Sequence, residues 1–193
     1  MKKKTIKDLD DAQVRGKRAL VRVDFNVPLD ENGQITDDTR IRASLPTIEL
    51  LLERQARTII ISHLGRPKGK PDPKYSLQPV SKRLEELCGS RVTFVESTDS
   101  DEALQASQNL KSGEILLLEN TRFLGGEEKN DPRLSRALAE LGDFFVNGNT
   151  WCQPRRFWRG CQLWLRFLKP VGRPGETDQL AITGSRERAA ALG

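Results

Sequence analysis

The sequence predicts an α/β protein with a mostly parallel β-sheet and helices on both faces. Short runs of β-branched and apolar residues alternate along the chain with longer segments whose apolar residues recur at helical spacing. The runs at 58–62 and 114–118 are apolar at their centres, which is typical of strands that a parallel sheet buries on both faces. Because strand and helix alternate throughout, crossover helices between parallel strands are favoured.

The first five elements are expected between residues 18 and 95. Residues 18–25 alternate in polarity, as a half-buried strand does, and residues 39–54 repeat apolar side chains at helical spacing. Residues 58–62 are a β-branched run and form the next strand. Residues 77–88 again place apolar side chains on one side of a helix, and residues 91–95 follow as a strand.

Two more helices and two more strands are expected before residue 147. Residues 101–110 form a helix with a weaker apolar pattern, and residues 114–118 form an apolar strand. The helix at 131–141 carries Pro132 in its first turn, where proline is tolerated, and residues 143–146 form the last strand. The predicted fold is Rossmann-like, with three layers, and incomplete at its C-terminal end.

Composition limits the classes of protein that the chain can represent. The 193 residues are 36% hydrophobic and 31% charged, as in a water-soluble globular protein. No apolar run approaches the roughly 20 residues that cross a bilayer, so we expect no membrane association. Three cysteines, an odd number, argue against a disulfide framework and favour the reducing cytoplasm.

The positive charge of the chain is confined to its last part. Residues 148–193 hold eight Lys or Arg and three Asp or Glu, which accounts for the whole net charge of +5, and they hold all three tryptophans. We therefore expect two unlike pieces: a folded domain at 1–147 and a divergent basic tail at 148–193. Our hypothesis for the tail is that it is disordered and translated partly out of frame.

Polar and charged residues follow three of the predicted strands. The carboxyl ends of parallel strands meet at one edge of a sheet, and α/β proteins bind ligands there. Guanidinium groups bind phosphate and carboxylate in a bidentate manner, and a glycine lets backbone amides approach such a ligand. We therefore expect a site for a small, multiply charged anion. Its candidate residues are Asp24, Phe25, Asn26, Arg40, His63, Leu64, Gly65, Arg66 and Arg122.

Four ordered motifs resemble the N-terminal domain of phosphoglycerate kinase. They are RVDFNVP at 22–28, DTRIRASLPTI at 38–48, SHLGRP at 62–67 and LENTRF at 118–123. The resemblance covers about residues 1–147 and is then lost, except for a short likeness at 167–170. It implies reversible phosphoryl transfer between 1,3-bisphosphoglycerate and ADP, giving 3-phosphoglycerate and ATP in glycolysis.

The resemblance also implies a role for each candidate residue. Asp24 and Asn26 would hold the glycerate part of the substrate, with Phe25 between them. A 3-phosphate clamp would consist of His63, Arg66 and Arg122, supported by Leu64 and Gly65. Arg40 would face the transferring phosphoryl group as the catalytic residue, since a positioned guanidinium neutralises charge on the equatorial oxygens.

Nucleotide binding is not expected from these 193 residues. In the family a C-terminal domain binds Mg-ATP or Mg-ADP, and no such domain follows here. The stretch at 65–71 superficially resembles a phosphate-binding loop, but proline replaces the Ser or Thr that would hold Mg²⁺. We therefore expect no cofactor-binding or metal-binding residue and a substrate-binding half that is inactive alone. The family is typically monomeric.

Two alternative functions stay open at this point. One is a non-catalytic module that binds 3-phosphoglycerate without turnover. The other is a nucleic-acid binder, because Arg and Trp interleave at 151–166 and such segments stack on single strands. We weigh this second alternative below the first, since an out-of-frame segment explains the same composition. A zinc site is not favoured, because Cys152 and Cys161 lack a second ligand pair.

Overall fold

A single six-stranded sheet organises the part of the chain that the structure describes. This computed structural model describes residues 5–127, 129, 131–148 and 169–172. The strands lie in the order β3-β4-β2-β1-β5-β6, and neighbouring strands are parallel. Their bounds are β1 (Arg18–Arg22), β2 (Arg57–Ile61), β3 (Val92–Val95), β4 (Ile115–Leu118), β5 (Phe144–Asn147) and β6 (Lys169–Gly172).

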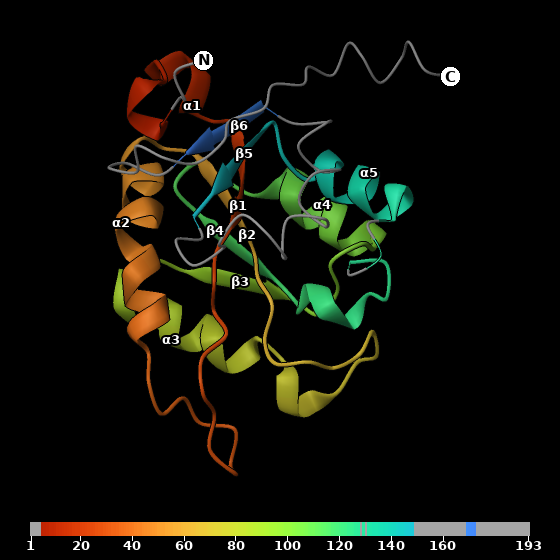
Figure 1. Ribbon diagram of the computed structural model, residues 1–193. Coiled ribbons are helices and arrows are strands. Elements are labelled where there is room, and N and C mark those ends of the chain that lie inside the picture. Colours follow the sequence, from red (N-terminus) through yellow and green to blue (C-terminus); the bar gives the residue numbers. More distant parts are fainter. Residues whose placement is uncertain (1–4, 128, 130, 149–168, 173–193) are drawn as a thin grey trace.

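Helices cover both faces of the sheet, as Figure 1 shows, with α2 and α3 on one side and α4 and α5 on the other. The α-helices are α1 (Asp11–Val14), α2 (Thr39–Glu53), α3 (Gln78–Cys88), α4 (Asp101–Asn109) and α5 (Pro132–Glu140). Three short 3-10 helices join them, η1 (Ile6–Asp8), η2 (Pro73–Tyr75) and η3 (Thr121–Phe123). No helix in the described ranges is both long and apolar enough to cross a membrane.

The sheet separates two apolar cores because successive side chains of each strand point to opposite faces. Val21 of β1 and Ile60 of β2 lie in the core under α2 and α3, whereas Leu20 and Ile59 lie in the core under α4 and α5. The central strands β1, β2 and β4 are therefore buried on both faces, as their apolar sequences require, whereas the edge strand β3 is partly exposed. The predicted α/β class, with a mostly parallel sheet in three layers, is confirmed.

The first strand is shorter than predicted. It was expected over 18–25, but β1 ends at Arg22. Beyond it, Val23 still donates its N–H to the carbonyl of Ile61 over 3.1 Å. Phe25 then donates its N–H to the hydroxyl of Ser62 instead of to a strand, over 2.9 Å. A side chain thus replaces the backbone ladder, and the chain leaves the sheet while Phe25 stays in the core.

An additional strand extends the sheet beyond the predicted set. β6 pairs in parallel with β5, with Lys169 opposite Phe144 and Gly172 opposite Asn147. No strand was expected in 148–193, although the likeness at 167–170 overlaps with it. Apart from Gly148 and β6, the predicted basic tail lies outside the described residues, and so do its three tryptophans and Cys152 and Cys161.

Candidate functional site

The candidate residues lie at the carboxyl ends of three neighbouring strands. β4, β2 and β1 are adjacent in the middle of the sheet and are parallel, so the segments that follow them share one edge. Residues 24–26 follow β1, residues 63–66 follow β2, and Arg122 lies in η3 after β4. Arg40 comes from elsewhere, as the second residue of α2. This edge is the usual ligand position in open α/β sheets.

Asp24 and Arg40 form an ion pair across the site. The Nη1 atom of Arg40 donates to Oδ2 of Asp24. The other oxygen, Oδ1, accepts the N–H of Asn26 over 3.1 Å. The Arg40 side chain is 43% exposed and that of Asp24 only 13% exposed. The guanidinium is therefore anchored at one nitrogen and still faces solvent, which leaves donors for an anionic ligand.

Asn26 holds the loop that follows β2. Its Oδ1 accepts the N–H of Gly65 over 2.8 Å. Gly65 has a φ of +61°, and a Cβ atom there would lie 2.3 Å from the ring of Tyr75. Only glycine fits both conditions. The glycine was expected to free a backbone amide for the ligand, but in this structure that amide is bonded to Asn26.

Arg122 binds the carbonyl group of the same glycine. Its Nη1 donates to the carbonyl oxygen of Gly65 over 2.6 Å. The residue is 7% exposed, and its own N–H bonds to the side chain of Asn120 over 3.0 Å. Both polar groups of Gly65 are thus bound by side chains from two other segments. The three segments that follow β1, β2 and β4 meet at this one residue.

His63 is buried in a positively charged surrounding. It is 9% exposed, and burial together with the charges of Arg122, Arg22 and Arg40 lowers its pKa to about 3 from the usual histidine value of 6.5. The imidazole is therefore neutral near pH 7 and offers one donor and one acceptor. Burial is the larger cause of this low pKa, and the arginine charges add to it; those same charges give the strand ends a positive potential, which favours an anionic ligand.

The other predicted residues differ in what they offer. Phe25 is fully buried and Leu64 is 3% exposed, so neither offers a side chain to a ligand at the surface. Arg66 is exposed on the same loop as His63. The structure thus brings Asp24, Asn26, Arg40, Gly65 and Arg122 into a connected set of hydrogen bonds and ion pairs, with His63 in the field of its arginines.

Several buried polar residues support the site but were not among its predicted members. Arg22 opens the motif at 22–28, and its Nη2 lies 3.6 Å from Oε1 of Glu127, with both side chains almost fully buried. Ser62 accepts the N–H of Phe25 and donates to the carbonyl of Val23, each over 2.9 Å. Only their place inside the strand-end motifs could have pointed to Arg22 and Ser62.

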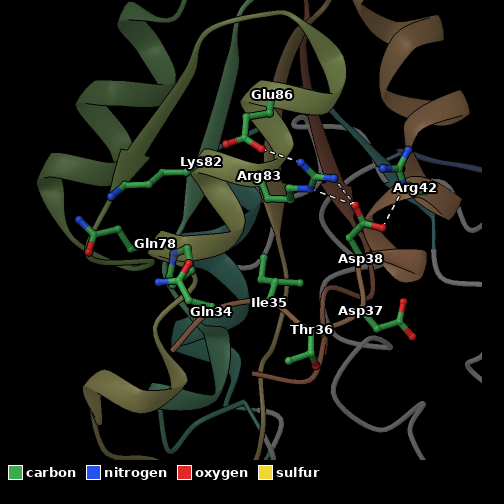
Figure 2. Close-up of a pocket in the computed structure, with 11 residues that line it drawn as sticks. Gln34, Ile35, Thr36, Asp37, Asp38, Arg42, Gln78, Lys82, Arg83 and Glu86 are labelled. Atoms are coloured by element: carbon green, nitrogen blue, oxygen red, sulfur yellow. Dashed lines mark hydrogen bonds and ion pairs between the residues drawn. The ribbon is translucent and has the colours of Figure 1, made fainter. Parts of the chain in front are cut away.

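A separate hollow of about 640 Å³ lies between the loop at 34–38, the start of α2 and α3. Figure 2 shows Asp38 among the lining residues, bonded to Arg42 of α2 and Arg83 of α3. The hydrogen bonds from these two arginines hold the pKa of Asp38 below its usual value. Arg83 also donates to Glu86 over 2.6 Å. The acids that line this hollow, Asp37, Asp38 and Glu86, balance its bases, Arg42, Lys82 and Arg83, so it lacks the excess of arginine at the strand ends.

Comparison with known proteins agrees with this geometry. The sequence model of phosphoglycerate kinase matches residues 9–149. The chain belongs to the phosphoglycerate kinase family. It is 62% identical over 149 residues to phosphoglycerate kinase of Chloroflexus aggregans, which covers 76% of this chain and 36% of that protein. It is 52% identical over 147 residues to that of Pseudothermotoga lettingae, with the same coverage.

Solved structures of the family share the fold. Phosphoglycerate kinase from Coxiella burnetii aligns with a TM-score of 0.74 at 30% identity, over 97% of this chain and 43% of that one. The enzyme from Pyrococcus horikoshii aligns with a TM-score of 0.75 at 28% identity, over 88% and 42%. The chain spans about a third of the length of the curated phosphoglycerate kinases it matches. The predicted resemblance is confirmed.

Proposed function

We propose that this chain is the phosphoglycerate-binding half of a phosphoglycerate kinase. One observation carries the proposal: three adjacent parallel strands bring Asp24, Asn26, His63 and Arg122 to one edge, where Arg40 joins them. Burial and, after it, the charges of Arg122, Arg22 and Arg40 lower the pKa of His63 to about 3, so the imidazole stays neutral beside these arginines. A ligand with a phosphate and a carboxylate, such as 3-phosphoglycerate or 1,3-bisphosphoglycerate, complements such a potential.

The geometry supports a division of work within the site. We assign the 3-phosphate to His63, Arg66 and Arg122, which lie on the loops after β2 and β4. Asp24 and Asn26 take the glycerate part, and the backbones of Phe25, Leu64 and Gly65 shape the floor. Arg40 supports the transferring phosphoryl group, because Asp24 anchors it while much of its guanidinium stays exposed. Such a positioned arginine stabilises charge that develops on the equatorial oxygens.

The second substrate of the reaction is Mg-ATP or Mg-ADP. Among the described residues no group of three His, Cys, Asp or Glu could hold a metal ion. We propose that the 193 residues by themselves bind the phosphoglycerate and do not turn it over, and that nucleotide must be presented by other residues. Residues 1–147 would then form the substrate domain, and the cytoplasm, where glycolysis runs, would be its location.

The tail at 148–193 is a separate part of this proposal. We propose that it does not contribute to the site and that residues 148–166 are read out of frame. Translation of the coding DNA in all three frames tests this directly. We expect a second frame to continue the family sequence beyond Asn147, and a coding sequence without such a frame would contradict the frameshift.

A turnover assay and a binding titration together test the proposed function. Purified chain is supplied with Mg-ATP and 3-phosphoglycerate, and ADP formation is followed. Binding of 3-phosphoglycerate is measured by calorimetry on the same preparation. We expect binding without turnover. Measurable turnover by contaminant-free protein would contradict the proposed inactivity, and absent binding by a folded chain would contradict the substrate-binding role.

A further inference from the structure

Asn120 lies two positions before Arg122, one of the residues assigned to the 3-phosphate. It follows β4 and precedes η3, and it is 1% exposed, so its side chain cannot itself face a solvent-exposed ligand. A buried amide is costly unless its donors and acceptor are bonded. Its contacts therefore indicate what the residue does for the fold of the site.

The side-chain amide of Asn120 bonds to three different segments. Its Nδ2 donates to the carbonyl oxygen of Leu64 over 2.7 Å and to that of Tyr75 over 3.0 Å. Its Oδ1 accepts the N–H of Arg122 over 3.0 Å. One side chain thus joins the loop after β2, the end of η2 and the turn that carries Arg122.

These contacts close a ring around the phosphate-binding segments. Asn120 connects the backbone of Leu64 to the backbone of Arg122, and the Arg122 side chain returns to the carbonyl of Gly65 over 2.6 Å. Gly65 follows Leu64 directly. The relative position of the loop at 63–66 and of Arg122 is therefore defined by hydrogen bonds at both ends.

The side chain of Glu119 binds the backbone of Asn120. Its Oε1 accepts the N–H of Asn120 over 2.7 Å and that of Leu77, at the start of α3, over 2.8 Å. Its Oε2 accepts the hydroxyl of Ser76 over 2.7 Å. Because Glu119 also binds the start of α3, it fixes Asn120 relative to that helix. The side-chain amide of Asn120 therefore holds both phosphate-binding segments at a defined position.

We propose that Asn120 is a positioning residue for phosphoglycerate binding, which sets the spacing between the loop at 63–66 and Arg122. The inference rests on the proposed function of the site. Asn120 does not touch the ligand; it acts by holding the backbones of Leu64 and Arg122 in place, so that the Arg122 guanidinium stays fastened to the Gly65 carbonyl and keeps one orientation at the strand ends. Misplacement by about 1 Å is enough to cost on the order of 100-fold in a site that depends on alignment.

Asn120→Ser separates this role from the capping of η3. Serine is a good N-cap, so its hydroxyl accepts the N–H of Arg122 as Oδ1 of Asn120 does. The shorter side chain loses both donors to Leu64 and Tyr75. Asn120→Asp is the second variant: it keeps the length and the acceptor, loses the same donors, and serves if the serine variant does not fold.

Thr98→Val is the matched control. Thr98 is 2% exposed, and its hydroxyl donates to the carbonyl oxygen of Glu119 over 2.8 Å, so it supports the same turn from the other side. It bonds to neither Leu64 nor Arg122. The valine variant removes a buried hydrogen bond of similar strength and leaves the spacing of the two segments unchanged.

The experiment is a double-mutant cycle on the affinity of the full chain for 3-phosphoglycerate. Dissociation constants are measured by NMR titration for wild type, Asn120→Ser, Arg122→Ala and the double variant, with thermal melts as a check of folding. We expect Asn120→Ser to weaken binding about tenfold in the wild-type background and less than about threefold without Arg122, since residues in one network couple. Thr98→Val should lower the melting temperature and leave affinity unchanged.

The possible outcomes distinguish the positioning role of Asn120 from the proposed function of the site. Equal losses for Asn120→Ser with and without Arg122, or a loss of affinity in Thr98→Val as large as that in Asn120→Ser, would overturn the positioning role alone. No binding by the folded wild type would overturn the proposed function and this inference with it. A loss confined to the background that contains Arg122 supports the positioning role.

Discussion

The side chain of Arg122 is bonded to the main chain of Gly65, over 2.6 Å from Nη1 to the carbonyl oxygen. These residues lie 57 positions apart and follow different strands. On its other side the N–H of Gly65 is bonded to Asn26. The contact therefore fastens the loop after β2 to the turn after β4, and it orients the guanidinium before any ligand arrives. Pre-orientation of this kind lowers the entropic cost of binding.

Removal of Arg122 should weaken the binding of 3-phosphoglycerate. Arg122→Ala deletes a charge-assisted partner of the phosphate, and we expect a loss of about 10- to 100-fold in affinity, measured by calorimetry. Arg122→Lys, the matched control, keeps the charge and loses the planar fork, so it should fall between wild type and alanine. Alanine and wild-type proteins with equal affinity would contradict the assignment of this residue.

Gly65→Ala should destabilise the fold. The added methyl group meets the Tyr75 ring at 2.3 Å, and the backbone is left-handed at +61°. We expect a cost of about 2–3 kcal/mol in the free energy of unfolding, measured by urea denaturation. Gly33→Ala is the control, since its φ is +74° with no atom within 4 Å. Its cost should stay near about 1 kcal/mol, and similar costs at both positions would show that the Tyr75 contact is unimportant.

His63 should make the folded state sensitive to acid. Its folded pKa, about 3, lies below the usual histidine value of 6.5 that holds in the unfolded chain, so the unfolded chain binds more protons between these values. Stability therefore rises with pH across this window, by up to about 1.4 kcal/mol per pH unit, and is lost as pH falls below about 6.5. Urea denaturation between pH 5 and pH 7 measures the slope. His63→Gln should have the smaller slope, and equal slopes would contradict the buried, neutral histidine.

The ion pair of Arg22 and Glu127 should matter more than exposed pairs. Their side chains are 5% and 7% exposed, so Glu127→Gln leaves a buried positive charge less compensated. We expect a cost of about 3 kcal/mol in the free energy of unfolding. Glu86→Gln breaks the pair with Arg83, whose side chains are 62% and 35% exposed, and should cost less than about 1 kcal/mol. Thermal melts compare the two, and a Glu86 effect as large as that of Glu127 would contradict this ranking.

The order of strands and helices was predictable because each one carries a local signal. The apolar runs of β2 and β4, the helical spacing in α2 and α3, and Pro132 at the start of α5 all act within a few residues. Once the strands are placed in a parallel sheet, the residues that follow them lie at one edge. This is why the sequence already grouped His63 with Arg122 at one edge of the sheet.

The contacts within the site were not predictable in the same way. Asn26 and Gly65 lie 39 positions apart, and Arg22 and Glu127 are separated in the sequence by the helices α2, α3 and α4. Such pairings depend on the register and twist of the whole sheet. The early end of β1 depends likewise on the hydroxyl of Ser62, and β6 depends on a free edge of β5. Local patterns carry no information on these distant partners.

A thermal melt of the full chain with and without 3-phosphoglycerate tests the central claim most directly. A ligand that binds only the folded state raises the free energy of unfolding by mass action, by about 2.7 kcal/mol at a concentration 100 times the dissociation constant. We predict a cooperative transition that moves to higher temperature with 3-phosphoglycerate and not with glycerate, which lacks the phosphate. A cooperative transition that 3-phosphoglycerate leaves unmoved at saturating concentration would contradict the assignment of a phosphoglycerate site to these strand ends.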